Sequence, residues 1–245
     1  SFISYNIILH SEWDIEFNLR ISFMRDSCLS IGSMIKSYPW SIHLSYVRYP
    51  RLRSACTDPA GPSIINGINV INGLNDYVGK RAEITYSKGV DLVKDGARGS
   101  NLLSDSIINE VKIADMAIFV GGLDATWEGE EMPGGINIDG FYNGDRTRIE
   151  LPEIQQKAIK DMVKTGTPVV LVLMAGSSIA LNGLEKELEA VLMAWYPGQR
   201  GGNAITSVLF GEYNPSGKLP VTFYSSTAEL PDFKDYNMQE GKGFT

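Results

Sequence analysis

The sequence predicts an α/β fold in which a mostly parallel sheet is covered by helices. From about residue 63 onward, short apolar runs alternate with stretches of helical periodicity. The run at 168–174 is the strongest strand signal in the chain, and the run at 116–120 is typical of a strand buried on both faces. Strands and helices in this rhythm imply right-handed crossovers between parallel strands.

The other elements are expected at short intervals along the same part of the chain. Residues 81–86 indicate a strand, and residues 104–114 place their apolar side chains on one helical face. Pro152 lies in the first turn of a helix that continues to residue 163 and is stopped by Gly166. Further expected elements are a short helix at 185–188, a helix at 203–210, a turn at 214–217, and a strand at 219–223, where Pro220 favours an edge position.

Residues 1–62 differ from the rest of the chain. They are rich in Ser, Tyr, Arg and Ile and show no sustained period of 3.6 or 2. We expect much of this segment to be irregular and leave its role unassigned. The α/β domain is therefore expected to span residues 63–245.

Composition excludes several classes of function. The chain has 245 residues, 43% of them hydrophobic, which is enough for one large domain or two small ones. A net charge of -7 and a pI near 5.0 argue against a nucleic-acid or anionic-membrane partner. The sequence contains no run of about 18 apolar residues, so it does not indicate a membrane span.

Few residues of the chain are suited to bind a metal. Cys28 and Cys56 make neither a disulfide framework nor a metal-ligand spacing, which leaves a single disulfide between them open. His10 and His43 provide little material for a zinc site or a Ser-His-Asp triad. The sequence therefore predicts neither a metal nor a cofactor.

The loop at residues 121–135, GGLDATWEGEEMPGG, is the candidate functional site. It follows the apolar run at 116–120 and places three glutamates within four positions, Glu128, Glu130 and Glu131. Functional groups of parallel α/β sheets lie in loops just past the carboxyl ends of strands, where this loop is expected. The alternative is a solvated acidic loop without a role.

Three stretches resemble the second, C-terminal domain of glycoside hydrolase family 3, which contains β-glucosidases and β-xylosidases. They are ADMAIFVGGLDATWEGEE (114–131), DRTRIELPEIQQKAI (145–159) and AWYPGQRGGNAITSVLFGEYNPSGKLPVTFY (194–224). The last is the most diagnostic, and GKRAEITYSKGVDLV (79–93) matches an earlier strand and turn of the family. The resemblance covers about residues 63–240 and implies a three-layer α/β/α sandwich.

The resemblance also implies a function for the acidic loop. Retaining glycosidases use two carboxyl groups, and in this family the second domain delivers the acid/base glutamate. The family motif points to Glu130, with Glu128 as runner-up, whereas Glu131 stands where the family commonly has Gly. Trp127 would form either an apolar wall that raises the pKa of this acid or a platform for a sugar ring. Asp145 and Arg146 match the family's Asp-Arg, which implies a local ion pair or a direct sugar contact.

The family's nucleophile and most of its sugar pocket lie on a (β/α)₈-like barrel. Such a barrel needs roughly 200 residues or more, so residues 1–62 cannot form it. The chain also ends before the family's last strand. We therefore expect one domain of a secreted or periplasmic enzyme that acts on oligosaccharides or aryl β-glycosides.

Its partner would be a barrel domain or chain, and self-association is expected when the docking face is open. The alternative is a non-catalytic domain that binds carbohydrate or a partner and keeps the fold without turnover.

Overall fold

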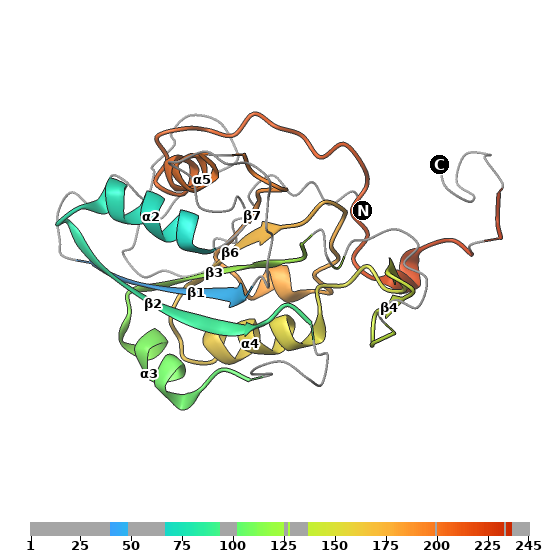
Figure 1. The fold of residues 1–245 in the computed structure, drawn as a ribbon, viewed down its shortest axis with the longest axis horizontal. Helices are drawn as coiled ribbons and strands as arrows, with labels where there is room; N and C mark the ends of the chain where they lie inside the picture. The colour runs from blue at the N-terminus through green and yellow to red at the C-terminus, as the bar shows by residue number, and fades with distance from the viewer. Residues whose placement is uncertain are drawn as a thin grey trace.

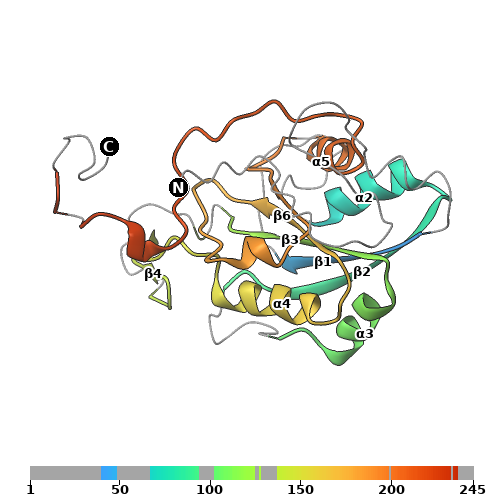
Figure 2. The ribbon, with the colours of Figure 1, turned by 180° about the vertical axis from the view of Figure 1, so that it is seen from behind.

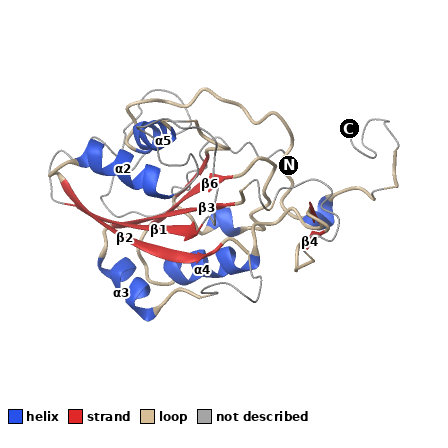
Figure 3. Cartoon of the chain, in the orientation of Figure 1, coloured by secondary structure: helices blue, strands red, loops and turns tan. Residues whose placement is uncertain are grey.

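The computed structural model describes residues 40–48, 67–93, 102–124, 127, 137–198, 200–232 and 234–236. Within these residues the chain forms a three-layer α/β/α sandwich, with one five-stranded parallel sheet between two layers of helices (Figures 1 and 3). The expected fold class is therefore confirmed.

The sheet has the strand order β2-β1-β3-β6-β7, and every neighbouring pair is parallel. All residues of β3 and β6 are buried, which explains why both segments are apolar without alternation. The strands are β1 (Trp40–Arg48), β2 (Ala82–Asp91), β3 (Met116–Gly122), β6 (Val169–Met174) and β7 (Ala190–Met193).

Two helices cover each face of the sheet. Figures 1 and 2 show α2 (Gly67–Val78) and α5 (Gly201–Leu209) on one face, and α3 (Asp105–Ile113) and α4 (Glu153–Val163) on the other. Two 3₁₀ turns, η1 (Leu184–Lys186) and η2 (Thr227–Glu229), and a hairpin of β4 (Phe141–Tyr142) and β5 (Asp145–Arg146) complete the described elements.

A separate hydrophobic core lies on each face, because successive residues of a strand point to opposite sides. Phe119 and Leu171 belong to the core beneath α3 and α4. Ile118 and Val172 belong to the core beneath α2 and α5. The central strands β3 and β6 are therefore held from both sides, and the loops that follow them start from fixed positions.

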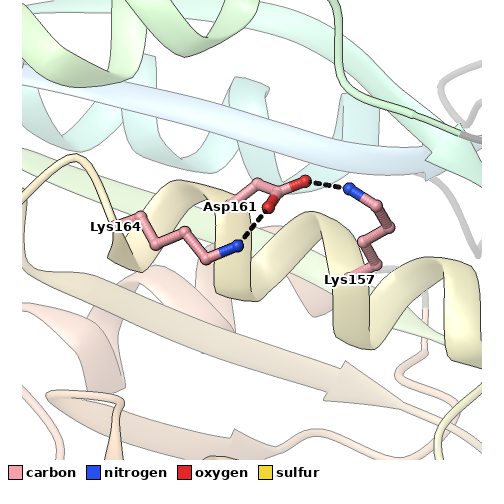
Figure 4. Close-up of polar contacts among 3 residues, drawn as sticks. All are labelled: Lys157, Asp161 and Lys164. Carbon is pink, nitrogen blue, oxygen red and sulfur yellow. Dashed lines mark hydrogen bonds and ion pairs between the residues drawn. The ribbon is translucent and has the colours of Figure 1, made fainter.

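Helix α4 is amphipathic, and its two faces have different roles. Its inner face buries Ile154, Gln155, Ala158, Ile159 and Met162. On its outer face, Asp161 accepts hydrogen bonds from Lys157 at 2.5 Å and from Lys164 at 2.9 Å (Figure 4). Burial acts to raise the pKa of Asp161, but the two lysines hold it below its usual value. Exposed pairs of this kind contribute about 0.5 kcal/mol each at most.

Most expected elements are confirmed, and two differ. The expected helix at 185–188 is only the 3₁₀ turn η1. The expected strand at 219–223 is wrong, because these residues join no sheet in the described structure. Pro220 cannot donate a backbone hydrogen bond to a ladder. Phe223 is buried, and its ring meets that of Trp195 edge-on with the centroids 6.0 Å apart.

The sequence analysis missed α2 and β1. Strand β1 lies between β2 and β3, so the sheet includes a strand from the segment that the sequence left unassigned. Residues 1–39 and 49–62 lie outside the described residues, and Cys28, Cys56 and His10 lie among them. His43 belongs to β1.

Candidate active site at the carboxyl edge of the sheet

The strand order reverses next to the loop that follows β3. The chain passes from β1 to β2 on one side and then crosses to β3 on the other side of β1. In open parallel sheets of this order, the connections that follow the two strands at the reversal, here β1 and β3, leave toward opposite faces of the sheet. Ligands bind between these connections, outside the carboxyl ends of the two strands. The loop that starts after Gly122 therefore leaves the sheet at its topological switch point.

Two glycines let β3 end in close contact with its neighbours. Gly122 has a φ of 127°, and a Cβ at this position would lie 1.8 Å from the carbonyl oxygen of Met174. A Cβ on Gly121 would lie 2.6 Å from Oε1 of Gln155. The next residue, Leu123, donates its backbone N–H to the Met174 carbonyl at 2.8 Å. Gly122 thus requires glycine, a larger residue at position 121 would displace the Gln155 side chain, and the start of the loop is locked onto the end of β6.

Gln155 holds the same point from the helix side. Its Oε1 accepts the backbone N–H of Gly122 at 2.8 Å. Its Nε2 donates to the carbonyls of Gly122 and Leu92, both at 2.7 Å. The side chain is fully buried, so all three hydrogen bonds are shielded from water.

The first residues of the loop are part of the core. Asp124 is 1% exposed, and its carbonyl accepts the backbone N–H of Trp127 at 2.9 Å. Trp127 is 7% exposed and packs against Phe141, with ring centroids 5.7 Å apart and planes inclined by 57°. Its Nε1 is buried and finds no acceptor in the described structure. Trp127 is therefore a packed side chain at the base of the loop.

The β4–β5 hairpin holds the other end of the loop. Arg146 donates through Nη1 to Oγ of Ser177 at 2.7 Å and to the carbonyl of Ser178 at 2.9 Å. Both serines follow β6, so this end is also fixed to the carboxyl edge of the sheet. Asp145, the preceding residue, is exposed. Nearby, Arg148 forms an exposed ion pair with Asp139 at 2.8 Å.

The chain between β5 and α4 is clamped from two sides. Leu151 donates its N–H to the carbonyl of Ala180 at 2.9 Å, and Ala180 donates to Ile149 at 2.8 Å. The carboxylate of Glu150 accepts from the backbone N–H of Thr227 at 2.6 Å and from its hydroxyl at 2.5 Å. Burial acts to raise the pKa of Glu150, but these hydrogen bonds hold it below its usual value. The helix that carries Gln155 therefore starts from a fixed segment.

The structure brings together only part of the set that the sequence predicts. Trp127 lies at the entrance of the loop, and Asp145 and Arg146 lie at its exit. Glu128, Glu130 and Glu131 lie outside the described residues.

The sequence analysis missed Gln155 and Ser177. An uncharged amide on the apolar face of α4 was the one signal that could have identified Gln155.

The described residues offer no metal centre and no membrane segment. No three of their His, Cys, Asp or Glu side chains lie close enough to hold a metal ion. Of the helices in the described part of the chain, none is long and apolar enough to cross a membrane.

The described residues form an α/β sandwich domain in which Trp127 and Arg146 lie beyond the carboxyl ends of the parallel strands. The chain belongs to the glycosyl hydrolase family 3 C-terminal domain, whose family profile matches residues 36–245. The match includes β1, in agreement with the place of that strand in the sheet.

Curated relatives of this chain are larger glycosidases. It is 46% identical over 159 residues to a xylan 1,4-beta-xylosidase of Xylanibacter ruminicola, a match that covers 65% of this chain and 18% of the relative. It is 31% identical over 201 residues to a periplasmic beta-glucosidase of Salmonella typhimurium, which covers 73% of this chain and 25% of that relative. The chain thus spans a quarter or less of the length of these two proteins.

Solved structures agree on the fold. A b-glucosidase from Erythrobacter marinus matches 80% of this chain with a TM-score of 0.59 and 24% identity, and the match covers 27% of that chain. A family 3 beta-glucosidase from Bifidobacterium adolescentis matches 83% of this chain with a TM-score of 0.57 and 21% identity, again over 27% of its own chain.

Proposed function

We propose that this chain is the acid/base-carrying domain of a retaining, exo-acting β-glycosidase, and that Glu130 is the general acid/base. The enzyme would hydrolyse terminal β-glucosyl or β-xylosyl O-glycosidic bonds. The observation that carries the proposal is the locked start of the acidic loop at the switch point, where Gly122 is held by both Gln155 and the end of β6. The names of the two curated relatives support both sugar classes.

The chemistry requires two carboxyl groups about 5–5.5 Å apart. One attacks the anomeric carbon while the other protonates the departing oxygen, and the second then deprotonates the water that releases the sugar. Glu130 would serve as the proton donor and acceptor. The nucleophile would come from a (β/α)₈ barrel domain or chain, which is the proposed partner.

Glu128 remains the runner-up for the acid/base role. It lies two residues before Glu130 in the same loop. The two residues differ in their distance from the packed Trp127, because Glu128 follows it directly. Substitution of each in turn separates the two assignments.

The other site residues would support the acid rather than react. The burial of Trp127 favours the apolar wall over the sugar platform, because a ring that is 7% exposed has little surface for stacking. Arg146 would fix the exit of the loop through Ser177 and Ser178. Asp145 is exposed and would be free to approach the sugar. The parent enzyme would act outside the cytoplasm, as the name of the Salmonella relative suggests.

The test uses this chain alone and together with a family 3 barrel domain, a pair that we call the barrel-completed protein. Aryl β-glucosides and aryl β-xylosides are the substrates. We expect turnover only by the barrel-completed protein, a loss of about 100-fold or more in Glu130→Gln, and a much smaller loss in Glu128→Gln. Unchanged turnover in Glu130→Gln would reject the assignment. No turnover in any combination would favour a non-catalytic domain that binds carbohydrate or a partner.

A further inference from the structure

We propose that Gln155 is a positioning residue for proton transfer, because its side chain fixes the point from which the acidic loop departs. This inference rests on the proposed function, since it takes Glu130 as the acid. Gln155 itself is fully buried in the first turn of α4, so it acts through the backbone of Gly122 rather than on the substrate.

The hydrogen bonds of Gln155 replace those of a missing strand neighbour. The ladder between β1 and β3 ends at Val120, but β3 continues to Gly122. Beyond Val120 the N–H and the carbonyl of Gly122 both bond to the Gln155 amide, at 2.8 and 2.7 Å. Leu92, which directly follows β2, receives the other hydrogen of Nε2 at 2.7 Å. One amide thus joins the ends of two strands that lie on opposite sides of β1.

Packing alone does not explain an amide at this position. A methionine or leucine would fill a similar volume on the apolar face of α4 without burying polar atoms. The amide is tolerated because both hydrogens of Nε2 and one lone pair of Oε1 are used. Its specific contribution is therefore the fixed position of the Gly122 backbone.

A short, buried stem leads from Gly122 to Trp127, three positions before Glu130 in the sequence. Leu123 is fully buried, Asp124 is 1% exposed, and the Asp124 carbonyl holds the N–H of Trp127. Trp127 directly precedes Glu128 in the chain. Within the described residues, Leu123, Asp124 and Trp127 therefore move with Gly122 as one packed unit. A displacement of about 1 Å at a reacting group can lower a rate about 100-fold.

The test compares Gln155→Met with Gln156→Met. Gln156 is the adjacent glutamine on the same helix, is half-buried, and in the described part of the chain donates to the Leu151 carbonyl at 2.6 Å. Both variants are assayed in the barrel-completed protein with a 2,4-dinitrophenyl glycoside, whose leaving group needs no proton, and with an alkyl glycoside, whose leaving group needs one. Exchange of the Gly122 amide hydrogen is measured on the chain itself.

We expect Gln155→Met to lower kcat/KM, which reports formation of the glycosyl-enzyme, by about 10- to 100-fold on the alkyl glycoside and by less than about threefold on the dinitrophenyl glycoside. The Gly122 amide should exchange at least about tenfold faster. Gln156→Met should leave all three values unchanged. An equal loss on both substrates, or no loss, would overturn the inference.

A second variant covers the case in which Gln155→Met does not fold. Gln155→Asn keeps a neutral amide but shortens the side chain by one methylene, so it cannot span the backbones of both Gly122 and Leu92. This variant should also lose more activity on the alkyl glycoside than on the dinitrophenyl glycoside. Equal losses on the two substrates would overturn the inference.

Glu130→Gln separates this inference from the function on which it rests. If Glu130→Gln is selective for the alkyl glycoside and Gln155→Met is not, only the positioning role fails. If neither Glu130→Gln nor Glu128→Gln is selective, the proposed function fails, and the positioning role fails with it.

Discussion

Arg146 and Ser177 join the exit of the acidic loop to the turn that follows β6. The guanidinium Nη1 of Arg146 donates to Oγ of Ser177 at 2.7 Å and also reaches the Ser178 carbonyl at 2.9 Å. The entrance of the same loop meets β6 as well, through the bond from Leu123 to Met174. Both ends of the loop are therefore fixed to the end of one central strand.

Removing the Arg146 guanidinium should release the exit of the loop. Arg146→Met keeps the alkyl stem but loses both hydrogen bonds from Nη1, so we expect the free energy of unfolding to fall by about 1–3 kcal/mol. Denaturant unfolding of the chain measures this change. Arg148→Met is the matched control, because the ion pair of Arg148 with Asp139 is exposed, and it should change stability by less than about 1 kcal/mol. Equal effects of the two substitutions would contradict the anchoring role.

Alanine at position 122 should be far more damaging than alanine elsewhere in the same region. The new Cβ would lie 1.8 Å from the Met174 carbonyl oxygen, so either β3 or β6 must move. We expect a loss of more than about 4 kcal/mol, measured as reduced soluble yield and melting temperature. Gly140 also has a positive φ, 88°, but an added Cβ there meets nothing within 4 Å. Gly140→Ala should therefore cost only about 1–2 kcal/mol. A similar stability for both variants would show that β3 does not end against β6 as described.

Replacement of Trp127 by phenylalanine should destabilise the chain less than replacement by alanine. Trp127→Ala removes the ring that packs against Phe141 and should cost about 3–5 kcal/mol. Trp127→Phe keeps an aromatic ring and removes a buried N–H that finds no acceptor in the described structure, so we expect a loss below about 2 kcal/mol. Chemical denaturation of the two variants gives the comparison. If phenylalanine were as damaging as alanine, the indole N–H would have to make a stabilising contact.

The raised pKa of Glu189 predicts that the stability of the chain depends on pH. Burial raises the pKa of this carboxyl above its usual value, so its ionisation opposes folding. A raised pKa means that the contribution to stability is present at low pH and is lost as the pH rises through the folded-state value. Glu189→Gln should therefore raise the melting temperature at pH 7 and have no effect near pH 4. Glu187→Gln, at an exposed position nearby, should have no effect at either pH. A lower melting temperature of Glu189→Gln at pH 7 would contradict the assigned cause.

The sequence predicted the centre of the fold better than its edges. Strands β3 and β6 are apolar throughout because both faces are buried, and this pattern is visible without a structure. Strand β1 was missed because its Ser, His and Arg residues make it resemble the irregular sequence around it. The pattern at 219–223 favoured a strand, but no described strand pairs with it, because periodicity carries no information about a partner.

The candidate site could be predicted in part. Family resemblance identified the loop and the residues at its two ends, because motif residues are contiguous in the sequence. Gln155 was missed because its partners, Gly122 and Leu92, are 33 and 63 residues away in the chain. Contacts of this kind arise from the topology of the sheet and leave no local pattern.

The most direct test of the proton donor is rescue by azide. In the barrel-completed protein, Glu130→Ala should turn over 2,4-dinitrophenyl β-xyloside or β-glucoside slowly, because water would attack the glycosyl-enzyme intermediate without a base. Azide needs no base, so it should raise kcat by at least about tenfold and yield the β-glycosyl azide. Glu128→Ala should give no azide product. Absence of rescue in Glu130→Ala, or a β-glycosyl azide from Glu128→Ala instead, would contradict the assignment of Glu130.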